Sequence, residues 1–375
     1  MKGRYFLGFL AFEMFCMRRF NVGILGATGM VGQRFITLLV EHPWFNLTAL
    51  AASKSSAGKT YEEALNGRWA MFGAIPEKVK NMPVFDAVSD VKKIVGLVDF
   101  VFCAVDMQKD EIKMLEEMYA KSECPVISNN SAHRFTPDVP MIIPEVNPEH
   151  AEVIFSQKKR LGTKKGFIAV KSNCSLQCYV PAIHPLMDFG VTKILACTYQ
   201  AISGAGKNFE RWPEMVDNII PYISGEEEKS ETEPMKIWGK VVEDKIENAT
   251  LPSITTQCLR VPVSDGHTAA VFASFENVPS LEKIVERWQN YKGVSDEISL
   301  PSAPKQFLHY FDEPLFPQIR SARELEKGMA VSVGRLRKDT QYDIKFVCMS
   351  HNTVRGAAGG AILMAELLCA KGFID

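Results

Sequence analysis

One cysteine of this 375-residue chain has the surroundings of a nucleophile. Cys174 follows the short apolar run 167–170 and the polar residues 171–173. This order predicts a strand, a short turn and a helix that starts near Cys174. A thiol at a helix N-terminus lies at the positive end of the helix dipole, which favours the nucleophilic thiolate. Because a lone cysteine is more often structural, the interpretation depends on the groups that accompany it.

An arginine and a histidine later in the chain are candidate partners for this thiol. Arg260 and His267 are seven residues apart, which on one continuous strand would place them on opposite faces. Pro262 and the pair 265–266 (Asp-Gly) predict a turn between them, so the two side chains are free to converge. A cysteine and a histidine far apart in sequence form a nucleophile–base pair in many folds, although a single histidine is more often structural.

A glycine-rich turn near the start of the chain predicts nucleotide binding. Residues 26–32 read GATGMVG and lie between a predicted strand, 20–25, and a predicted helix, 33–40. Glycines let the backbone approach a pyrophosphate, and the helix N-terminus stabilises its charge. The spacing alone is also compatible with a structural turn, but strand, turn and helix together favour a dinucleotide.

The end of the next predicted strand, 47–52, indicates which dinucleotide is bound. Enzymes that use NAD usually carry a carboxylate here for the ribose 2′-hydroxyl. This chain has Ser53, Lys54, Ser55 and Ser56 instead, and hydroxyls with an ammonium group suit the 2′-phosphate of NADP. The alternative is a solvated serine-rich turn.

The elements that must position these groups indicate an α/β protein. Strands are expected at 98–105 and 125–128, and strands that alternate with helices predict a parallel, doubly wound sheet. The chain length suits two domains. Residues 1–19 begin with basic residues, but their apolar run is short and interrupted by Glu13. We expect a disordered extension there, and no other run approaches the roughly 18 apolar residues that cross a membrane.

Composition gives no reason to expect several classes of function. The chain has 43 basic and 44 acidic residues and a net charge of −1, so it lacks the basic surplus typical of nucleic-acid binding. Its nine cysteines include no Cys-x-x-Cys pair, which argues against a structural metal site. Free thiols are typical of the reducing cytoplasm, where we expect this protein to act on a small molecule.

Beyond residue 19, nearly the whole chain resembles the aspartate-β-semialdehyde dehydrogenase family. The motifs that carry the resemblance occur in the family's order: GATGMVG (26–32), SNCS (172–175), QAISGAG (200–206), EEEK (226–229), RVPVSDGH (260–267) and NTVRGAAGG (352–360). The resemblance implies a Rossmann-type NADP-binding domain formed by 20–149 and 351–375. It also implies an α+β catalytic and dimerisation domain over 150–350, and a homodimer or homotetramer. The last helix, 353–370, should return to the first domain.

The resemblance also implies a role for each residue of the site. It makes Cys174 the nucleophile, His267 the acid/base and Gln200 the residue that positions the intermediate. Substrate and phosphate are expected on Arg260 (carboxylate), Glu226 (ammonium), Arg134 and Lys229 (phosphate), and Asn173. NADP is expected on Gly26, Thr28, Gly29, Met30, Val31, Gly32, Ser53, Ser55, Ser56, Gly204 and Asn352. Without the resemblance, 226–229 reads as a solvated charge run. Residues 176–178 depart from the small residues that many relatives have after the nucleophile.

The implied reaction is the reversible, NADPH-dependent reductive dephosphorylation of L-4-aspartyl phosphate to L-aspartate-4-semialdehyde, through a thioester on Cys174. It belongs to lysine, threonine and methionine biosynthesis. Malonyl-CoA reductase on the same scaffold and N-acetylglutamyl-phosphate reductase are alternatives, but neither substrate offers a free ammonium group to Glu226. A further alternative is a non-catalytic NADPH-binding sensor, which the joint presence of Cys174, Gln200, Arg260 and His267 disfavours.

Overall fold

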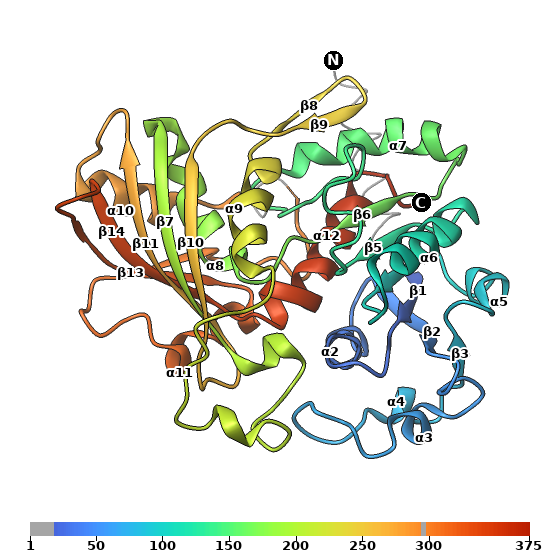
Figure 1. Ribbon diagram of the computed structural model, residues 1–375. Helices are drawn as coiled ribbons and strands as arrows, with labels where there is room; N and C mark the ends of the chain where they lie inside the picture. Colours follow the sequence, from blue (N-terminus) through green and yellow to red (C-terminus); the bar gives the residue numbers. More distant parts are fainter. Residues whose placement is uncertain (1–18, 294–297) are drawn as a thin grey trace. The chain divides into compact units, whose positions relative to one another are not determined.

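The computed structural model describes residues 19–293 and 298–375, which form two compact units (Figure 1). The first contains the described residues up to Ser128, with Lys158–Ile168 and Ala365–Asp375; the second contains Asn129–Gln157 and Ala169–Met364. The boundaries between these compact units differ from the predicted domain boundaries, which lie between residues 149 and 150 and between residues 350 and 351. The division into a cofactor-binding and a catalytic domain stays a prediction. Of the expected N-terminal extension, residues 1–18 lie outside the described residues.

The first unit is built on the predicted parallel sheet, with strand order β3-β2-β1-β4-β5-β6. Its strands are β1 (Phe20–Leu25), β2 (Phe45–Ala52), β3 (Val84–Asp86), β4 (Phe100–Cys103), β5 (Val126–Ser128) and β6 (Ile168–Val170), the last of which crosses the boundary between the units. Its helices are α2 (Met30–Leu39), α3 (Tyr61–Leu65), α4 (Glu77–Lys80), α5 (Val91–Val95) and α6 (Lys109–Lys121). All four residues of β4 are buried, as expected for a strand covered on both faces.

The glycine-rich turn between β1 and α2 follows from close backbone packing. Gly26 has a φ of +88°, and a Cβ there would lie 2.3 Å from the carbonyl oxygen of Ala104 after β4. A Cβ at Gly32 would lie 2.2 Å from the carbonyl oxygen of Gly26. Gly29 has no such contact, since its nearest neighbour would be at 3.5 Å. The outer glycines therefore shape the turn, while the middle one leaves room for a ligand to approach.

The second unit contains a mixed sheet with strand order β10-β7-β11-β14-β13-β12. The strands are β7 (Val191–Gln200), β10 (Ser253–Arg260), β11 (His267–Phe275), β12 (Leu308–Phe311), β13 (Val331–Lys338) and β14 (Ile344–Ser350). Buried and half-buried residues alternate along β11, so one face of the sheet packs against the core, where α8 (Leu176–Ile183) lies. Also present are α9 (Glu226–Ile237), α10 (Leu281–Asn290), α11 (Ile319–Ala322) and the hairpin β8 (Lys240–Val242) and β9 (Lys245–Glu247).

Several shorter or boundary elements complete the described chain. The 3-10 helices are η1 (Pro148–Val153), η2 (His184–Phe189), η3 (Ile202–Ala205), η4 (Pro213–Met215) and η6 (Leu325–Gly328), and η7 (Val354–Ala358) is a π-helix. Two helices, α7 (Ile154–Leu161) and α12 (Gly359–Ala370), cross the boundary between the units. Residues 365–370 of α12 therefore belong to the first unit, together with the C-terminus.

Two prolines inside helices shape the surroundings of Cys174. Pro181 lies within α8, which is only eight residues long and passes into η2. Pro234 lies within α9 and has no N–H for the carbonyl of Ser230, four residues earlier. The hydroxyl of Tyr179 on α8 donates a hydrogen bond to that carbonyl at 2.6 Å. The carbonyl that Pro234 leaves without a helical N–H thus joins α9 to the helix that follows the nucleophile.

A buried ion pair supports the same region from the other side. The guanidinium of Arg355, on η7, is fully buried and binds both carboxylate oxygens of Glu145. Its Nε donates to Oε1 of Gln177 at 3.2 Å, and Nε2 of Gln177 donates to Oγ of Ser172 at 2.7 Å. The pair is therefore linked through one side chain to the turn before Cys174.

Replacing Glu145 with glutamine should destabilise the fold strongly. The change leaves the Arg355 cation buried without a counter-charge, which typically costs about 3–5 kcal/mol. We expect a loss of this size in the free energy of unfolding, measured by urea denaturation. The matched control is Glu247→Gln, which removes an exposed pair with Lys245 and should change stability little. Equal stability of the two variants would contradict the prediction.

Candidate active site

Cys174 lies beside His267 at the start of α8. The helix begins at Leu176 with Ser175 as its N-cap, so the predicted turn and helix are present. The Sγ atom of Cys174 lies 3.4 Å from Nε2 of His267, which is the first residue of β11. The two residues are 93 positions apart in sequence. The fold therefore forms the thiol–imidazole pair that the sequence suggested.

Arg260 reaches the same place from the neighbouring strand end. Arg260 is the last residue of β10 and pairs with Gln200 at the end of β7, while β11 pairs with the other edge of β7. A Cβ at Gly204 would lie 2.8 Å from Nη1 of Arg260 and 3.3 Å from Nε2 of His267. The turn at 261–266 thus brings the two side chains together, and Gly204 leaves space between them.

The thiol of Cys174 is not activated in the way that its position before a helix suggested. Burial raises the pKa of Cys174, and the carboxylate of Glu226 raises it further. Lys171, Arg134 and Arg260 act in the opposite direction, but the pKa still rises to about 11. The expectation that the helix N-terminus favours thiolate was therefore wrong for the protein alone. Loss of hydration and the Glu226 carboxylate together outweigh the three nearby cations here.

His267 is a neutral hydrogen-bond donor towards the thiol. The ring is fully buried, and the backbone N–H of Ala201 donates to its Nδ1 at 3.0 Å. Burial and then the Arg260 guanidinium lower the pKa of His267 to about 3, so the ring is neutral at physiological pH. Because Nδ1 accepts a hydrogen bond, the ring proton is on Nε2, which faces Cys174.

The acidic run 226–229 opens α9 rather than forming a solvated loop. Lys229 donates to Oε1 of Glu226 at 2.8 Å, as expected for residues three apart on one helix face. Nδ2 of Asn173 donates to the same oxygen at 2.9 Å, and Gln200 donates to Oε2 at 3.3 Å. Burial raises the pKa of Glu226, but Lys229 and these hydrogen bonds together lower it, so the carboxylate is charged. Glu228 is exposed, which distinguishes it from Glu226.

Arg134 is buried and already held by three groups. Its Nε donates to the carbonyl of Lys171 at 3.0 Å and its Nη2 to the carbonyl of Asn129 at 3.1 Å. Its Nη1 donates to Oε1 of Glu233 at 2.7 Å. Sequence reasoning missed Glu233, although its place seven residues after Glu226 puts both on one face of α9. A phosphate would have to share Arg134 with this carboxylate.

The first unit has a pocket of about 600 Å³ at the carboxyl ends of β1 to β4, where open parallel sheets bind ligands. Of the predicted cofactor residues, Gly26, Thr28, Gly29 and Ser53 line it. The others do not line it. Met30, Val31 and Gly32 form the first turn of α2, Ser56 is buried, and the Ser55 hydroxyl contacts that of Ser53. Gly204 and Asn352 belong to the second unit. The oxygen of the Asn352 amide accepts from the backbone of Gly266 at 2.7 Å.

The charged groups of this pocket fit a 2′-phosphate. Lys54 lines it, as does Arg68, whose Nε and Nη2 donate to the carbonyls that end α3. Asp86 also lines it, but its Oδ1 already accepts from the backbone of Val88 and Ser89. Sequence reasoning missed Arg68, because nothing in the loop 66–76 indicates that it returns to the glycine turn.

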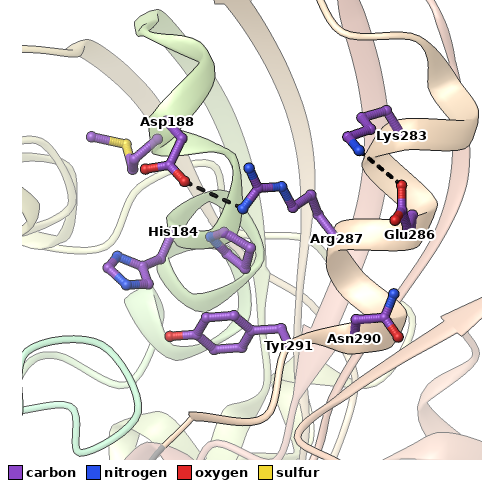
Figure 2. Close-up of a pocket in the computed structure, with 9 residues that line it drawn as sticks. His184, Asp188, Lys283, Glu286, Arg287, Asn290 and Tyr291 are labelled. Carbon is purple, nitrogen blue, oxygen red and sulfur yellow. Dashed lines mark hydrogen bonds and ion pairs between the residues drawn. The ribbon is translucent and has the colours of Figure 1, made fainter.

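A second pocket, of about 490 Å³, lies between η2 and α10 and contains none of the predicted site residues (Figure 2). Its charges pair among themselves: Arg287 with Asp188 at 3.2 Å and Lys283 with Glu286 at 3.1 Å. Groups of three or more potential metal-binding side chains do not occur among the described residues. Within 19–293 and 298–375, no helix is long and apolar enough to cross a membrane.

Comparisons with known proteins identify the family of this chain. The family pattern described as "Semialdehyde dehydrogenase, NAD binding domain" matches residues 21–154, and "Semialdehyde dehydrogenase, dimerisation domain" matches residues 183–355. The aspartate-semialdehyde dehydrogenase of Archaeoglobus fulgidus is 42% identical over 350 residues, covering 93% of this chain and 98% of that protein. That of Saccharomyces cerevisiae is 40% identical over 366 residues, covering 94% and 98%.

A solved structure extends the similarity to the whole fold. The crystal structure of the aspartate semialdehyde dehydrogenase from Candida albicans with NADP has a TM-score of 0.85 and 38% sequence identity. It covers 95% of this chain and 100% of that one. The chain therefore belongs to the aspartate-semialdehyde dehydrogenase family.

Proposed function

We propose that this protein catalyses the reversible, NADPH-dependent reductive dephosphorylation of L-4-aspartyl phosphate to L-aspartate-4-semialdehyde, in lysine, threonine and methionine biosynthesis. The observation that carries the proposal is the 3.4 Å approach of the Cys174 sulfur to Nε2 of His267, beside Glu226 and Arg260. Acyl transfer to and from an amino acid requires a nucleophile and a hydrogen-bond donor, which Cys174 and His267 provide. It also requires one side chain of each charge to bind the amino acid, which Glu226 and Arg260 provide.

The charged groups suit a substrate with a free ammonium and a carboxylate. Glu226 is a buried, ionised carboxylate that offers the ammonium a counter-charge, and Arg260 offers the carboxylate a planar fork of donors. Malonyl-CoA and N-acetylglutamyl phosphate have no free ammonium, so they would leave Glu226 without a partner from the substrate. We assign phosphate to Lys229 and Arg134, and close contact with the substrate to Asn173.

The reaction divides into two steps at Cys174. The sulfur of Cys174 attacks the acyl carbon, so that a C–S bond forms and the bond from that carbon to the phosphate oxygen breaks. The thiol proton leaves with the phosphate, because His267 is neutral and its Nδ1 already accepts a hydrogen bond. NADPH, when bound, supplies the hydride that reduces the thioester carbon. The N–H at Nε2 of His267 then stabilises the negative oxygen, and Gln200 positions it. Collapse of that oxyanion breaks the C–S bond and releases the semialdehyde, and the thiolate takes a proton from solvent to restore the thiol.

The cofactor is held by backbone at one end and by cations at the other. The turn around Gly29 and the N-terminus of α2 take the pyrophosphate, whose charge the helix dipole stabilises. Ser53, Lys54 and Arg68 take the 2′-phosphate. The two predicted residues of the second unit, Gly204 and Asn352, are assigned to the nicotinamide end.

Replacing Lys54 with alanine should weaken the binding of NADPH but not that of NADH. Loss of one hydrogen bond between charged groups costs about 1.5–3 kcal/mol, so we expect the KM for NADPH to rise roughly 10- to 100-fold. The KM for NADH, which has no 2′-phosphate, should stay the same. Lys92→Ala, an exposed change on α5, is the control. Equal increases for both cofactors would argue against this placement of the 2′-phosphate.

We further propose that the protein is a cytoplasmic homodimer or homotetramer. The half-exposed face of the mixed sheet carries Tyr199, and the loop before α9 exposes Val216, Ile219 and Tyr222, each more than half exposed. Apolar surface of this kind is typical of protein interfaces. Sedimentation velocity measures the assembly, and Ile219→Asp should shift it towards monomer.

The decisive experiment measures NADPH formation from L-aspartate-β-semialdehyde and NADP⁺, with and without phosphate. We expect strong activity that needs phosphate, because phosphate must cleave the thioester. If the protein binds NADPH but shows no such activity, the reduction of malonyl-CoA or a role as a non-catalytic NADPH sensor becomes the better proposal. Iodoacetamide distinguishes these two, since selective alkylation of Cys174 indicates a catalytic thiol.

A further inference from the structure

We propose that Glu233 is a positioning residue for the catalytic cysteine, because its carboxylate fixes both the backbone beside Cys174 and the side chain of Arg134. The inference rests on the proposed function only in taking Cys174 as the nucleophile. Glu233 contributes to the reaction through these neighbours.

The carboxylate of Glu233 binds two segments that are far apart in sequence. The side chain is fully buried on α9. Its Oε2 accepts from the backbone N–H of Asn173 at 2.7 Å, and its Oε1 accepts from Nη1 of Arg134 at 2.7 Å. Both bonds are short and charge-assisted, and such bonds are roughly twice as strong as neutral ones. Glu233 therefore links the backbone of Asn173, the residue before Cys174, to Arg134.

The ion pair also encloses the segment before the nucleophile. Nε of Arg134 donates to the carbonyl of Lys171, so Arg134 holds one end of 171–173 while Glu233 holds the other. The Nζ of Lys171 is buried and has no hydrogen-bond partner among the residues described. Burial and then the nearby Arg355 hold the pKa of Lys171 well below its usual value. The side chain that pairs with the carboxylate of Glu233 is Arg134, at 2.7 Å.

Other contacts already attach α9 to its surroundings. The Tyr179 hydroxyl binds the carbonyl of Ser230, and the ammonium of Lys236 donates to the carbonyls of Arg134, Thr136 and Val139 at 2.7–2.8 Å. The two bonds of Glu233 are distinct from these, because one of them ends on the backbone N–H of Asn173, the residue before the reacting cysteine. A displacement of about 1 Å at a reacting group costs on the order of 10²-fold in rate.

The test is the variant Glu233→Gln. An amide offers one acceptor and one donor, so it leaves either the Asn173 N–H or the Arg134 N–H facing another N–H. We expect kcat, per active site titrated by alkylation, to fall roughly 10- to 100-fold. The binding of NADPH, followed by fluorescence, should be unchanged. Glu228→Gln on the exposed side of the same helix is the matched control and should keep wild-type kcat.

A second measurement separates positioning from loss of folded protein and needs no substrate. The variant leaves Arg134 without its counter-charge, and a net positive charge near Cys174 favours thiolate. The midpoint of Cys174 alkylation by iodoacetamide against pH should therefore move to lower pH, although turnover is slower. Simple instability would reduce the number of active sites without moving the midpoint of those that remain.

Slower turnover with a lower midpoint supports the proposal. Unchanged kcat per active site overturns it, and so does slower turnover with an unmoved midpoint. If Glu233→Gln does not fold, Glu233→Asp decides, because it keeps the charge but is too short to reach both donors. It should keep the midpoint and lose turnover, whereas full turnover overturns the inference. Absence of phosphate-dependent turnover in the wild type would instead refute the proposed function, and the alkylation measurement would still test Glu233.

Discussion

Replacing Cys174 with alanine should abolish phosphate-dependent formation of NADPH from L-aspartate-β-semialdehyde. The methyl side chain forms no thioester, so both the hydride step and the cleavage by phosphate lose their intermediate, and we expect a loss of about 10⁴-fold or more. The assay follows absorbance of NADPH at saturating substrate. NADPH binding should persist, because the cofactor pocket lies in the first unit and does not include Cys174.

The control for this variant is Cys197→Ala, a second partly accessible thiol, on β7. It should keep wild-type turnover. Near-normal, phosphate-dependent turnover of Cys174→Ala would refute the thioester route.

In the wild type, alkylation of Cys174 should accelerate as the pH rises towards 11, because the raised pKa keeps the thiol protonated at neutral pH.

Replacing His267 with alanine should lower kcat about 10²- to 10⁴-fold, the usual contribution of a positioned proton donor. The N–H at Nε2 lies 3.4 Å from the Cys174 sulfur and would face the oxygen that becomes negative on hydride transfer. His267→Gln keeps an N–H and should recover part of the lost rate. Measurements of kcat at saturating substrate for the three proteins give the comparison.

The neutral ring also predicts the shape of the pH profile. Burial and Arg260 lower the pKa of His267 to about 3, so the imidazole does not change its charge between pH 5 and 8. The dependence of kcat on pH in that range should therefore be the same for the wild type and His267→Gln. An acidic limb near pH 6.5 that disappears in His267→Gln would show that the ring titrates, and it would contradict the donor role.

Local patterns predicted the elements around the site well. The first strand was predicted at 20–25, where β1 lies, because an apolar β-branched run that ends in glycine has few other interpretations. The order of strands and helices likewise indicated the parallel sheet. The helix that starts at Glu226 was not predicted, since its charged residues show no apolar face, and only the family resemblance singled Glu226 out.

What the sequence did not reveal are contacts between distant residues. Glu233 meets Arg134 from 99 positions away, and Arg355 meets Glu145 from 210 positions away. No periodicity encodes such pairs, because each partner alone is an ordinary charged residue. The pKa of Cys174 was also mispredicted, since it depends on burial that only the assembled fold creates.

The strand-end placement of the acid and the carboxylate-binding group has a consequence for how this site can diverge. Arg260 and His267 are the terminal residues of β10 and β11, and both strands take their register from β7. Substitutions along the strands leave the positions of these end residues unchanged, so single substitutions around them can alter substrate preference gradually. Loss of a single residue within β11 would instead turn the imidazole to the opposite face of the sheet. We therefore expect substitutions within β10 and β11 to be tolerated far better than deletions during the evolution of this site.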